Sequence, residues 1–578
     1  MKIALCQINP VAGNIAYNQN LMATEIESAA RAGAQLALFT ELSVTGYPPR
    51  DLLDYPGFLD RARRATEQLH DLCRRQNIAA IVGTVTPNPA SGKKGLYNTA
   101  AVLLPHEDYP TLIHKTLLPT YDVFDELRYF EPAPAGQNST VVTIALADHP
   151  PVRLGITICE DIWNDSKFWK DERLYPVDPV DAVVNDDADI IINISASPFV
   201  QNKPLRRVQM LRHVARRRDI PVVFVNQVGG NDQVVFDGGS CVVLPNGNIP
   251  ALNGWFEAKT VIWDTADESH WGGADSALND LTQNPLNVYK ALRLGLRDYM
   301  ARTGFTQVIV GNSGGIDSAV VLALATLALG PDDVISVTMP GHYTSSETYD
   351  DAGDLARNMG IRHISLPIGA IHEQFSQLLR TPESPFVQGI LGGDATAVAP
   401  IADQNVQARI RGNILMYISN AIAAPNTLLL TTGNKSELAV GYCTLYGDMC
   451  GGLALLSDVP KMLVYQLARL INTFGDYIPQ SIIDREPSAE LAPDQKDSDS
   501  LPPYPVLDEI IRLFVEEHRS TEEIVAAGVA DEPTVQRTVR MIELAEYKRA
   551  QAAPGIKVTS KAFGVGRRIP IARGNPIF

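Results

Sequence analysis

The chain has 578 residues, of which 45% are hydrophobic and 20% charged, and its formal net charge is −17. This length exceeds what one hydrophobic core supports, so two domains of roughly 250–300 residues are expected. The composition is that of an ordinary globular protein, and the absence of an apolar run of about 18 residues excludes a transmembrane helix. The acidic balance argues against nonspecific binding to nucleic acid, although a nucleotide ligand would need only local donors.

The N-terminus and the cysteines indicate the compartment. Residues 1–8 are typical of a buried strand and lack the basic segment, long apolar run and cleavage site of a secretory signal. The six cysteines, at positions 6, 73, 159, 241, 443 and 450, form no CxxC pair and no zinc-type spacing. We therefore expect a cytoplasmic protein with free thiols.

Short apolar strands alternate with helical stretches in the first half of the chain. The pattern predicts helices at 21–32 and 59–75 and strands at 78–85, 99–104, 153–158, 190–195, 221–227 and 261–264. Such alternation is typical of a layered α/β domain, which we expect over residues 1–265. The polar stretch that follows, with Gly272-Gly273 inside it, predicts a linker at 266–283.

Three segments of this domain end an apolar strand in a chemically useful side chain: Glu41, Lys115 and Cys159. Each has an ordinary structural explanation when taken alone, as a surface charge or a small buried thiol. Active sites in α/β layers gather at the carboxyl ends of strands, however, and all three residues lie at such ends. Glu41 could accept the thiol proton, Cys159 could attack a carbonyl carbon, and Lys115 could stabilise the resulting oxyanion.

This Glu-Lys-Cys set resembles that of the nitrilase superfamily, and the resemblance extends over the first ~265 residues. It implies an αββα layered fold and hydrolysis of a C–N bond through a thioester. The segment 121–130 resembles the loop that follows the lysine in glutamine-hydrolysing members, and the segment around 195–203 resembles their amino-acid-binding stretch. The resemblance implies a glutamine site of Tyr121, Glu126, Ser197 and Lys203, in which Tyr121 contacts the substrate and Glu126 supports the catalytic groups.

A second α/β pattern begins at about residue 284. It predicts helices at 286–301 and 319–328 and strands at 307–311, 334–338, 362–367 and 427–432, which together favour a doubly wound parallel sheet over residues 284–578. Two long polar or proline-rich segments, 381–400 and 490–505, are typical of functional lids or disordered loops.

The strand at 307–311 runs into a glycine turn that opens a helix. Successive backbone N–H groups at a helix N-terminus form an anion site, and two hydroxyls add donors. A Walker A loop would need a lysine, whereas here an aspartate stands where it could hold Mg²⁺. The predicted ATP site comprises Gly311, Asn312, Ser313, Gly314, Gly315, Ile316, Asp317 and Ser318.

The S-G-G-x-D-S sequence of this turn resembles that of the pyrophosphatase-type ATP enzymes, whose domain is Rossmann-like (adenine nucleotide alpha hydrolase-like). Further segments at 339–345, 405–413, 431–437, 446–448 and 561–568 resemble NAD synthetases. That resemblance implies that Thr432 contacts ATP, that Glu437 shares Mg²⁺ with Asp317, and that Asn405, Glu437 and Lys561 contact deamido-NAD. Asn312 departs from the family, which commonly has a leucine at this position.

Together these features predict a carbon–nitrogen ligase that uses glutamine as amido donor, with ATP as co-substrate and Mg²⁺ as cofactor. We expect small-molecule substrates (glutamine, ATP and deamido-NAD), no nucleic-acid or membrane partner, and a homo-oligomer. Three alternatives remain open: a related amidotransferase with a different acceptor, an amidase whose ATP domain only senses nucleotide, and a fusion without catalysis.

Overall fold

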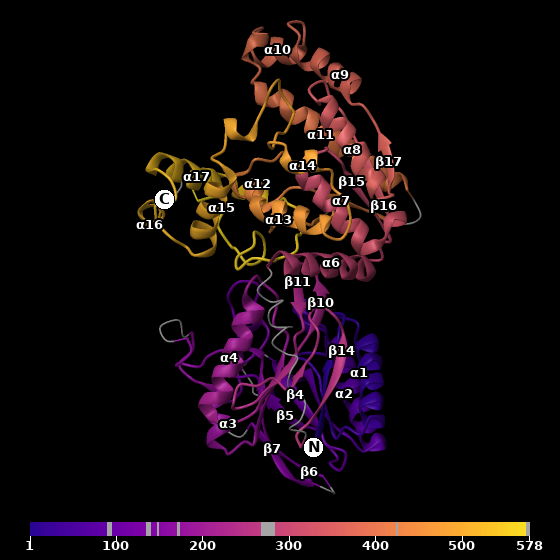
Figure 1. Ribbon diagram of the computed structural model, residues 1–578, viewed down its shortest axis with the longest axis vertical. Coiled ribbons are helices and arrows are strands. Elements are labelled where there is room, and N and C mark those ends of the chain that lie inside the picture. The colour runs from indigo at the N-terminus through magenta and orange to yellow at the C-terminus, as the bar shows by residue number, and fades with distance from the viewer. Residues whose placement is uncertain are drawn as a thin grey trace. The chain divides into compact units, whose positions relative to one another are not determined.

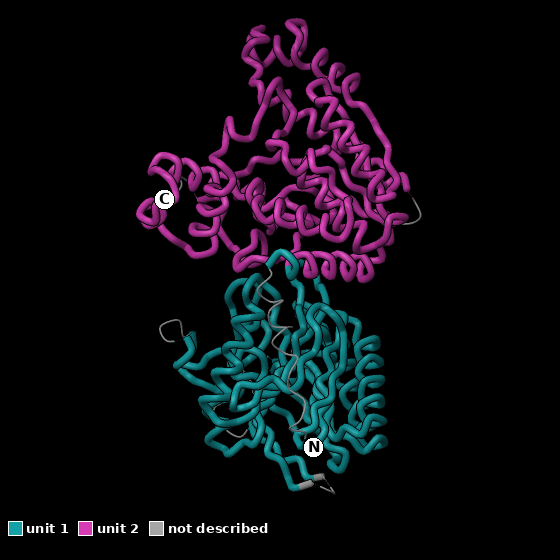
Figure 2. The backbone as a smooth tube through the Cα atoms, viewed as in Figure 1, with its two compact units in different colours: residues 1–287 teal, residues 288–578 magenta. Residues whose placement is uncertain are grey.

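The computed structural model describes residues 1–89, 95–134, 140–146, 149–169, 174–266, 284–422 and 426–573. The chain divides into two compact units, Met1–Asn287 and Val288–Phe578 (Figure 2). Most of the expected linker, residues 267–283, lies outside the described residues.

Two six-stranded mixed sheets form the first unit. One sheet has the order β14 (Lys259–Asp264), β1 (Lys2–Gln7), β2 (Leu36–Leu38), β3 (Ala79–Pro87), β4 (Leu96–Leu103), β5 (Thr111–His114). The other has the order β13 (Ala251–Leu252), β12 (Cys241–Val243), β9 (Val222–Asn226), β8 (Ile190–Ser195), β7 (His149–Ile158), β6 (Val141–Leu146). A separate hairpin joins β10 (Val228–Asn231) to β11 (Val234–Asp237).

The sheets face each other because their strands are apolar on both sides. Ile3 and Leu5 of β1 share one core with Ile156 and Ile158 of β7, while Ala4 and the other alternate residues of the first sheet pack against helices. The helices α1 (Ile15–Arg31) and α2 (Pro56–Gln76) cover the first sheet, and α3 (Pro179–Asn185) and α4 (Lys203–Arg218) cover the second (Figure 1). This is the expected αββα arrangement.

A five-stranded, wholly parallel sheet forms the centre of the second unit. Its order is β17 (Arg362–Ser365), β16 (Val334–Thr338), β15 (Gln307–Gly311), β18 (Thr427–Thr431), β19 (Leu453–Ala454). The strand order reverses between β15 and β18, and ligands of doubly wound folds bind at such a switch point. The expected doubly wound sheet is therefore confirmed.

Helices cover both faces of this sheet. Ile309 of β15 packs with Ile410 and Leu415 of α11. The helix α7 contacts β15 and β16, and α13 packs against α7. The helices are α6 (Asn284–Thr303), α7 (Ile316–Leu329), α8 (Ser346–Asn358), α9 (Gly369–Arg380), α10 (Pro385–Ile390), α11 (Pro400–Ala421), α12 (Lys435–Val440), α13 (Lys461–Asn472) and α14 (Gln480–Asp484).

A cluster of C-terminal helices, which the sequence pattern did not predict, packs on α12 through its own apolar core. It contains α15 (Tyr504–Ile511), the π-helix η9 (Arg512–Glu516), α16 (Thr521–Ala526), α17 (Glu532–Leu544) and α18 (Glu546–Arg549).

Some segments differ from the sequence-based expectation. Helix α1 begins at Ile15, six residues earlier than expected, because the Asn14 side chain accepts a hydrogen bond from the Tyr17 N–H and caps it. The segment 381–400 contains α10, which Ser384 caps by accepting from the Phe386 N–H. The segment 490–505 contains a short 3₁₀ turn, η8 (Asp497–Asp499), fixed by a hydrogen bond of 2.7 Å from the Tyr504 hydroxyl to Asp497.

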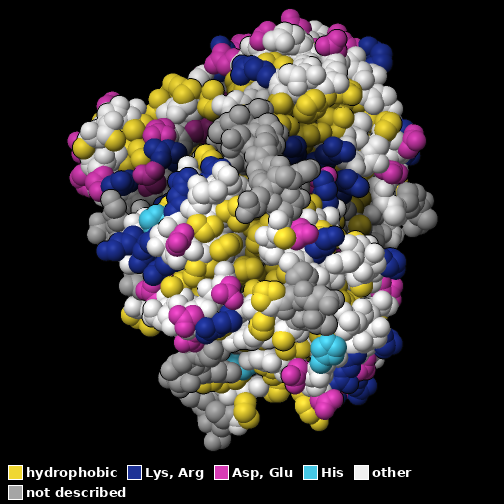
Figure 3. All heavy atoms as spheres, turned by 60° about the horizontal axis from the view of Figure 1, so that its bottom comes forward, with side chains coloured by type: hydrophobic (Ala, Val, Ile, Leu, Met, Phe, Trp, Pro, Cys, Tyr) yellow, Lys and Arg dark blue, Asp and Glu magenta, His cyan; other side chains and the backbone are white. Residues whose placement is uncertain are grey.

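The surface carries charges of both signs. Over the face that Figure 3 shows, Lys and Arg side chains lie close to Asp and Glu side chains. Among the described helices, none is long and apolar enough to cross a membrane.

Candidate active sites

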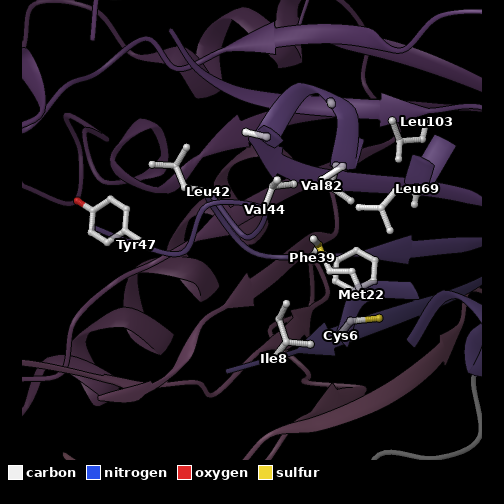
Figure 4. Packing of buried hydrophobic residues seen from close by; sticks show 14 of the residues in the cluster. Cys6, Ile8, Met22, Phe39, Leu42, Val44, Tyr47, Leu69, Val82 and Leu103 are labelled. Carbon is white, nitrogen blue, oxygen red and sulfur yellow. The ribbon is translucent and has the colours of Figure 1, made fainter. Parts of the chain in front are cut away.

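Glu41 is held at the end of β2 by the core on one side and a tight turn on the other. Phe39 and Leu42 on either side of it are buried in the cluster beneath α1 and α2 (Figure 4). Leu42 has a left-handed backbone with φ 45°. The turn lies against Gly83, where an added Cβ would come within 2.2 Å of the Leu42 nitrogen, so only glycine fits there. The Glu41 side chain is fully buried.

Lys115 follows β5, which runs in the same direction as β2 because β4 between β3 and β5 is antiparallel to both. Its ammonium, also fully buried, donates to Glu41 Oε1 at 2.6 Å and to both carboxylate oxygens of Glu126 at 2.8 Å. Burial by itself would lower the pKa of Lys115, but Glu126 and Glu41 outweigh burial and raise it. Lys115 is therefore a cation at neutral pH.

Two more donors fix the Glu41 carboxylate. The Asn98 side-chain amide donates to Oε1 at 2.8 Å, and the Ala196 N–H donates to Oε2 at 3.1 Å. Glu126 is likewise held by the Tyr47 hydroxyl, at 2.9 Å from Oε1. Burial raises the pKa of Glu126 to about 7, against the opposing effect of Lys115.

Cys159 follows β7 directly and opens the 3₁₀ turn η3 (Cys159–Ile162). Its φ of 45° is left-handed, a conformation that costs a non-glycine residue roughly 1–2 kcal/mol. Burial raises the pKa of the Cys159 thiol, Glu41 raises it further, and Lys115 opposes both. A thiol in this state needs a base to remove its proton as it attacks.

The next residue, Glu160, supplies a third buried carboxylate, which accepts hydrogen bonds from two tyrosines. The Tyr121 hydroxyl donates to its oxygens at 2.9 and 3.0 Å, and the Tyr175 hydroxyl donates at 3.3 Å. Burial raises the pKa of Glu160. Tyr121, which the resemblance assigned to glutamine, is thus hydrogen-bonded to the residue that directly follows Cys159.

Ser197 and Lys203, also assigned to glutamine, lie in the segment after β8. The Ser197 N–H donates to Asn226 at 2.8 Å, and its hydroxyl lies 3.5 Å from the buried guanidinium of Arg207. Arg207 in turn forms two hydrogen bonds with Asp237, at 3.0 and 3.1 Å. The Lys203 ammonium lies 5.5 Å from the centre of the Trp163 ring. Burial lowers the pKa of Lys203 to about 8, and the positive charge of Arg207 contributes to this decrease.

In the second unit, the glycine turn joins β15 to α7 as expected. Gly314 has φ 75°, and a Cβ there would lie 2.2 Å from the Thr348 carbonyl oxygen. Asn312, where the resemblance led us to expect a leucine, accepts from the Gly314 N–H at 3.1 Å and donates to Ser336 and to the Ala352 carbonyl at 3.0 and 2.9 Å. The asparagine therefore stabilises the turn with hydrogen bonds that leucine could not make.

Asp317 at the start of α7 faces Glu437 of α12, with the buried ammonium of Lys461 between them. Lys461 Nζ lies 2.5 Å from Asp317 and 3.3 Å from Glu437, and Asn434 donates to Asp317 at 2.9 Å. Burial raises the pKa of Glu437 to about 8; Asp317 adds to this rise and Lys461 opposes it. The two carboxylates therefore converge on a single cationic centre.

A cavity of about 440 Å³ opens over these groups. It is lined by the whole turn 311–318, and also by Thr432, Asn405, Glu437 and Lys461. Lys561 is not among the described residues that line it; its backbone carbonyl accepts from the Lys435 ammonium at 2.9 Å. Its assigned contact with deamido-NAD stays a prediction.

Several residues of both centres escaped the sequence analysis. Glu160 and Asp161 could have been suspected, since they directly follow Cys159. Asn98, Tyr47 and Lys461 had no local signal, because their partners lie 57, 79 and 144 residues away.

Comparison with known proteins agrees with both halves. A carbon-nitrogen hydrolase family model matches residues 2–268, and an NAD synthase family model matches residues 288–552. A glutamine-dependent NAD(+) synthetase of Synechocystis is 43% identical over 99% of this chain and 98% of its own, and that of Thermotoga maritima is 36% identical over the same shares. The solved glutamine-dependent NAD+ synthetase of Acinetobacter baumannii, in complex with adenosine diphosphate, is 35% identical with a TM-score of 0.71, over 99% of this chain and 98% of that one.

These matches span the chain. In this structure, the unit that matches the hydrolase model contains the buried Glu41–Lys115 pair, and the unit that matches the NAD synthase model contains Asp317 and Glu437 beside the glycine turn. The resemblance expected from the sequence is confirmed: the chain belongs to the family of glutamine-dependent NAD(+) synthetases.

Proposed function

We propose that this chain converts deamido-NAD to NAD, using ATP and ammonia released from glutamine, with AMP, pyrophosphate and glutamate as the other products. Family membership supports the overall reaction. The observation that supports it most is that each unit brings together the reactive groups expected of it: Glu41 with Lys115 in the first, and Asp317, Glu437 and the turn 311–318 in the second.

In the first unit, Glu41 accepts the proton of Cys159 as the sulfur attacks the side-chain amide carbon of glutamine. The ammonium of Lys115 stabilises the oxyanion of the tetrahedral intermediate, and Glu126 keeps that ammonium in place with two hydrogen bonds. The amide nitrogen takes up a proton and leaves as ammonia, giving a thioester on Cys159. Water, deprotonated by Glu41, then releases glutamate and restores the thiol.

Recognition of glutamine is assigned to the groups around this centre. Lys203 suits the α-carboxylate as a charged donor, beside the hydroxyl of Ser197. Glu160, which accepts hydrogen bonds from Tyr121 and directly follows Cys159 in the chain, suits the N–H groups of the amide or amino end of glutamine as an acceptor.

In the second unit, the turn 311–318 receives the phosphates of ATP on its backbone N–H groups. The nicotinate carboxylate of deamido-NAD attacks the α-phosphorus, pyrophosphate leaves, and an adenylate forms. Ammonia displaces AMP from that adenylate to form the amide. Lys461 adds positive charge where pyrophosphate departs, and Thr432, which lines the same cavity, contacts ATP. Asn405 and Glu437 line the same cavity and are proposed to face deamido-NAD.

The residues at this cavity fit a magnesium ion. Mg²⁺ prefers one or two carboxylates, with the remaining positions filled by water and substrate phosphates. Asp317 and Glu437 supply two such carboxyl groups, and the Lys461 ammonium that lies between them is itself a cation bound by both. Among the described residues, no group of three or more His, Cys, Asp or Glu side chains could hold a metal ion. Bound there, Mg²⁺ would supply positive charge to the phosphates.

The division of labour and the setting are also proposals. We assign residues 1–265 to the glutaminase domain, 266–283 to the linker and 284–578 to the synthetase domain. The six unpaired cysteines, all at described positions, support a reducing, cytoplasmic setting. We also propose a homo-oligomer that acts on small molecules.

A panel of acceptors tests this function. Pyrophosphate release should be measured with ATP, ammonium and either deamido-NAD or another carboxylate- or carbonyl-bearing nucleotide. We expect deamido-NAD to give the highest kcat/KM by at least tenfold. A higher value with another acceptor would assign the chain a different substrate.

A further inference from the structure

Asp161 connects the two chain segments that carry the proposed nucleophile and oxyanion donor. It is the third residue of η3, and its side chain is buried, with 2% of the residue's surface exposed. Its Oδ2 accepts from the Ile158 N–H at 3.0 Å. Its Oδ1 accepts from the Thr116 and Leu117 N–H groups at 3.1 and 2.8 Å.

These bonds hold the residue before Cys159 and the two residues after Lys115. The bond to Ile158 closes the turn in which Cys159 has its left-handed backbone, in the manner of a side chain that caps a helix start. The bonds to Thr116 and Leu117 cross 45 and 44 residues of sequence. One carboxylate therefore connects the turn that contains Cys159 to the segment that follows Lys115.

The bonding is specific to a carboxylate. Both oxygens act only as acceptors, and three backbone N–H groups use them. An asparagine would have one oxygen and one NH₂ group, so at least one backbone N–H would face another donor. A buried, unsatisfied donor costs roughly 1–3 kcal/mol, and the turn or the strand end would shift to relieve it.

We propose that Asp161 is a positioning residue for the glutaminase reaction. It holds Cys159 and Lys115 at the right positions relative to the amide carbonyl of the same glutamine molecule. The proposal rests on the function proposed above. The hydrogen bonds of the Asp161 side chain described above are all to backbone N–H groups, so it acts through the backbone of both segments. Because a displacement of about 1 Å can cost on the order of 10²-fold in rate, loss of this positioning should lower kcat.

The chain offers a matched control. Asp165, four residues further on, is also a buried aspartate and accepts from the Lys167 and Phe168 N–H groups at 2.8 and 3.0 Å. It pairs with Arg217 and makes no contact with residues 116, 117 or 158 among the hydrogen bonds of the described chain. Substitution of either aspartate removes a buried carboxylate, but only Asp161 joins the two reactive segments.

The test uses the full-length chain with Asp161→Asn and Asp165→Asn. Glutamate release from glutamine should lose roughly 10–100-fold in kcat in Asp161→Asn, with KM for glutamine within about threefold. The rate at which iodoacetamide alkylates Cys159 should also differ between Asp161→Asn and the wild type. Asp165→Asn should lower the melting temperature without either effect. Ammonium-driven NAD formation should be unchanged in both.

Two outcomes would overturn the proposal. One is a kcat within twofold of wild type in Asp161→Asn; the other is an equal loss of kcat in both variants, which would make Asp161 merely structural. If Asp161→Asn does not fold, Asp161→Glu keeps both acceptor oxygens but lengthens the side chain, and the same loss of kcat is expected. A wild-type chain that released no glutamate would instead contradict the proposed function itself.

Discussion

Glu126→Gln isolates the charge that holds Lys115. In the wild type, the buried ammonium makes two hydrogen bonds of 2.8 Å to Glu126 and one of 2.6 Å to Glu41. Glutamine at position 126 keeps the shape but removes the charge and one acceptor. The ammonium would then be drawn toward Glu41, the proposed base, and would be less available to the oxyanion.

The magnitude follows from these contacts. A hydrogen bond to a charged group contributes about 1.5–3 kcal/mol, and the two bonds share one carboxylate, so we take about 3 kcal/mol. At about 1.4 kcal/mol per tenfold change, kcat for glutamate release should fall on the order of 10²-fold. Tyr47→Phe removes only the hydroxyl that donates to Glu126 at 2.9 Å, and should cost under about tenfold.

The assay is the initial rate of glutamate release at saturating glutamine, with ammonium-driven NAD formation measured on the same preparation. That second rate should not change in either variant, since its groups lie in the other unit. A Glu126→Gln rate within threefold of wild type would refute the reasoning. So would a larger loss in Tyr47→Phe than in Glu126→Gln.

Two further predictions concern single charges. Because burial lowers the pKa of Lys203 to about 8, its ammonium is charged below that pH and neutral above it. The value of kcat/KM for glutamine should therefore fall as pH rises through about 8. The Lys203→Arg variant, whose side chain stays charged, should not show this fall. Asp317→Asn should lower the rate of NAD formation on the order of 10²-fold with either glutamine or ammonium, since loss of a metal-site partner typically costs roughly 10–100-fold. An unchanged rate of pyrophosphate release in this variant would place the metal elsewhere.

Local sequence signals predicted the framework of both units. The strand β15, the glycine turn and α7 follow one another within about 23 residues, so periodicity and turn chemistry suffice to place them. Glu41, Lys115 and Cys159 could be singled out because each ends an apolar strand, and β2, β5 and β7 do end directly before or near them.

Contacts between distant segments were beyond the reach of those signals. Lys461 opens a helix that looks like any other, and only the fold brings it to Asp317. The bonds of Asp161 to Thr116 and Leu117 depend on how η3 meets the end of β5, which no local pattern encodes. The packing of the C-terminal helices on α12 is likewise tertiary, although the helices themselves carry local signals, since Ser520 caps α16 and Asp531 caps α17.

The central claim is that glutamine cleavage and amide formation use separate groups in the two units. Cys159→Ala tests it most directly, because the thiol takes part only in glutamine cleavage. NAD formation from deamido-NAD and ATP should be measured in this variant with glutamine and, separately, with a high concentration of ammonium salt. We expect no detectable rate with glutamine and a rate close to that of wild type with ammonium. A rate with glutamine above a trace, or loss of the ammonium-driven rate, would contradict the account.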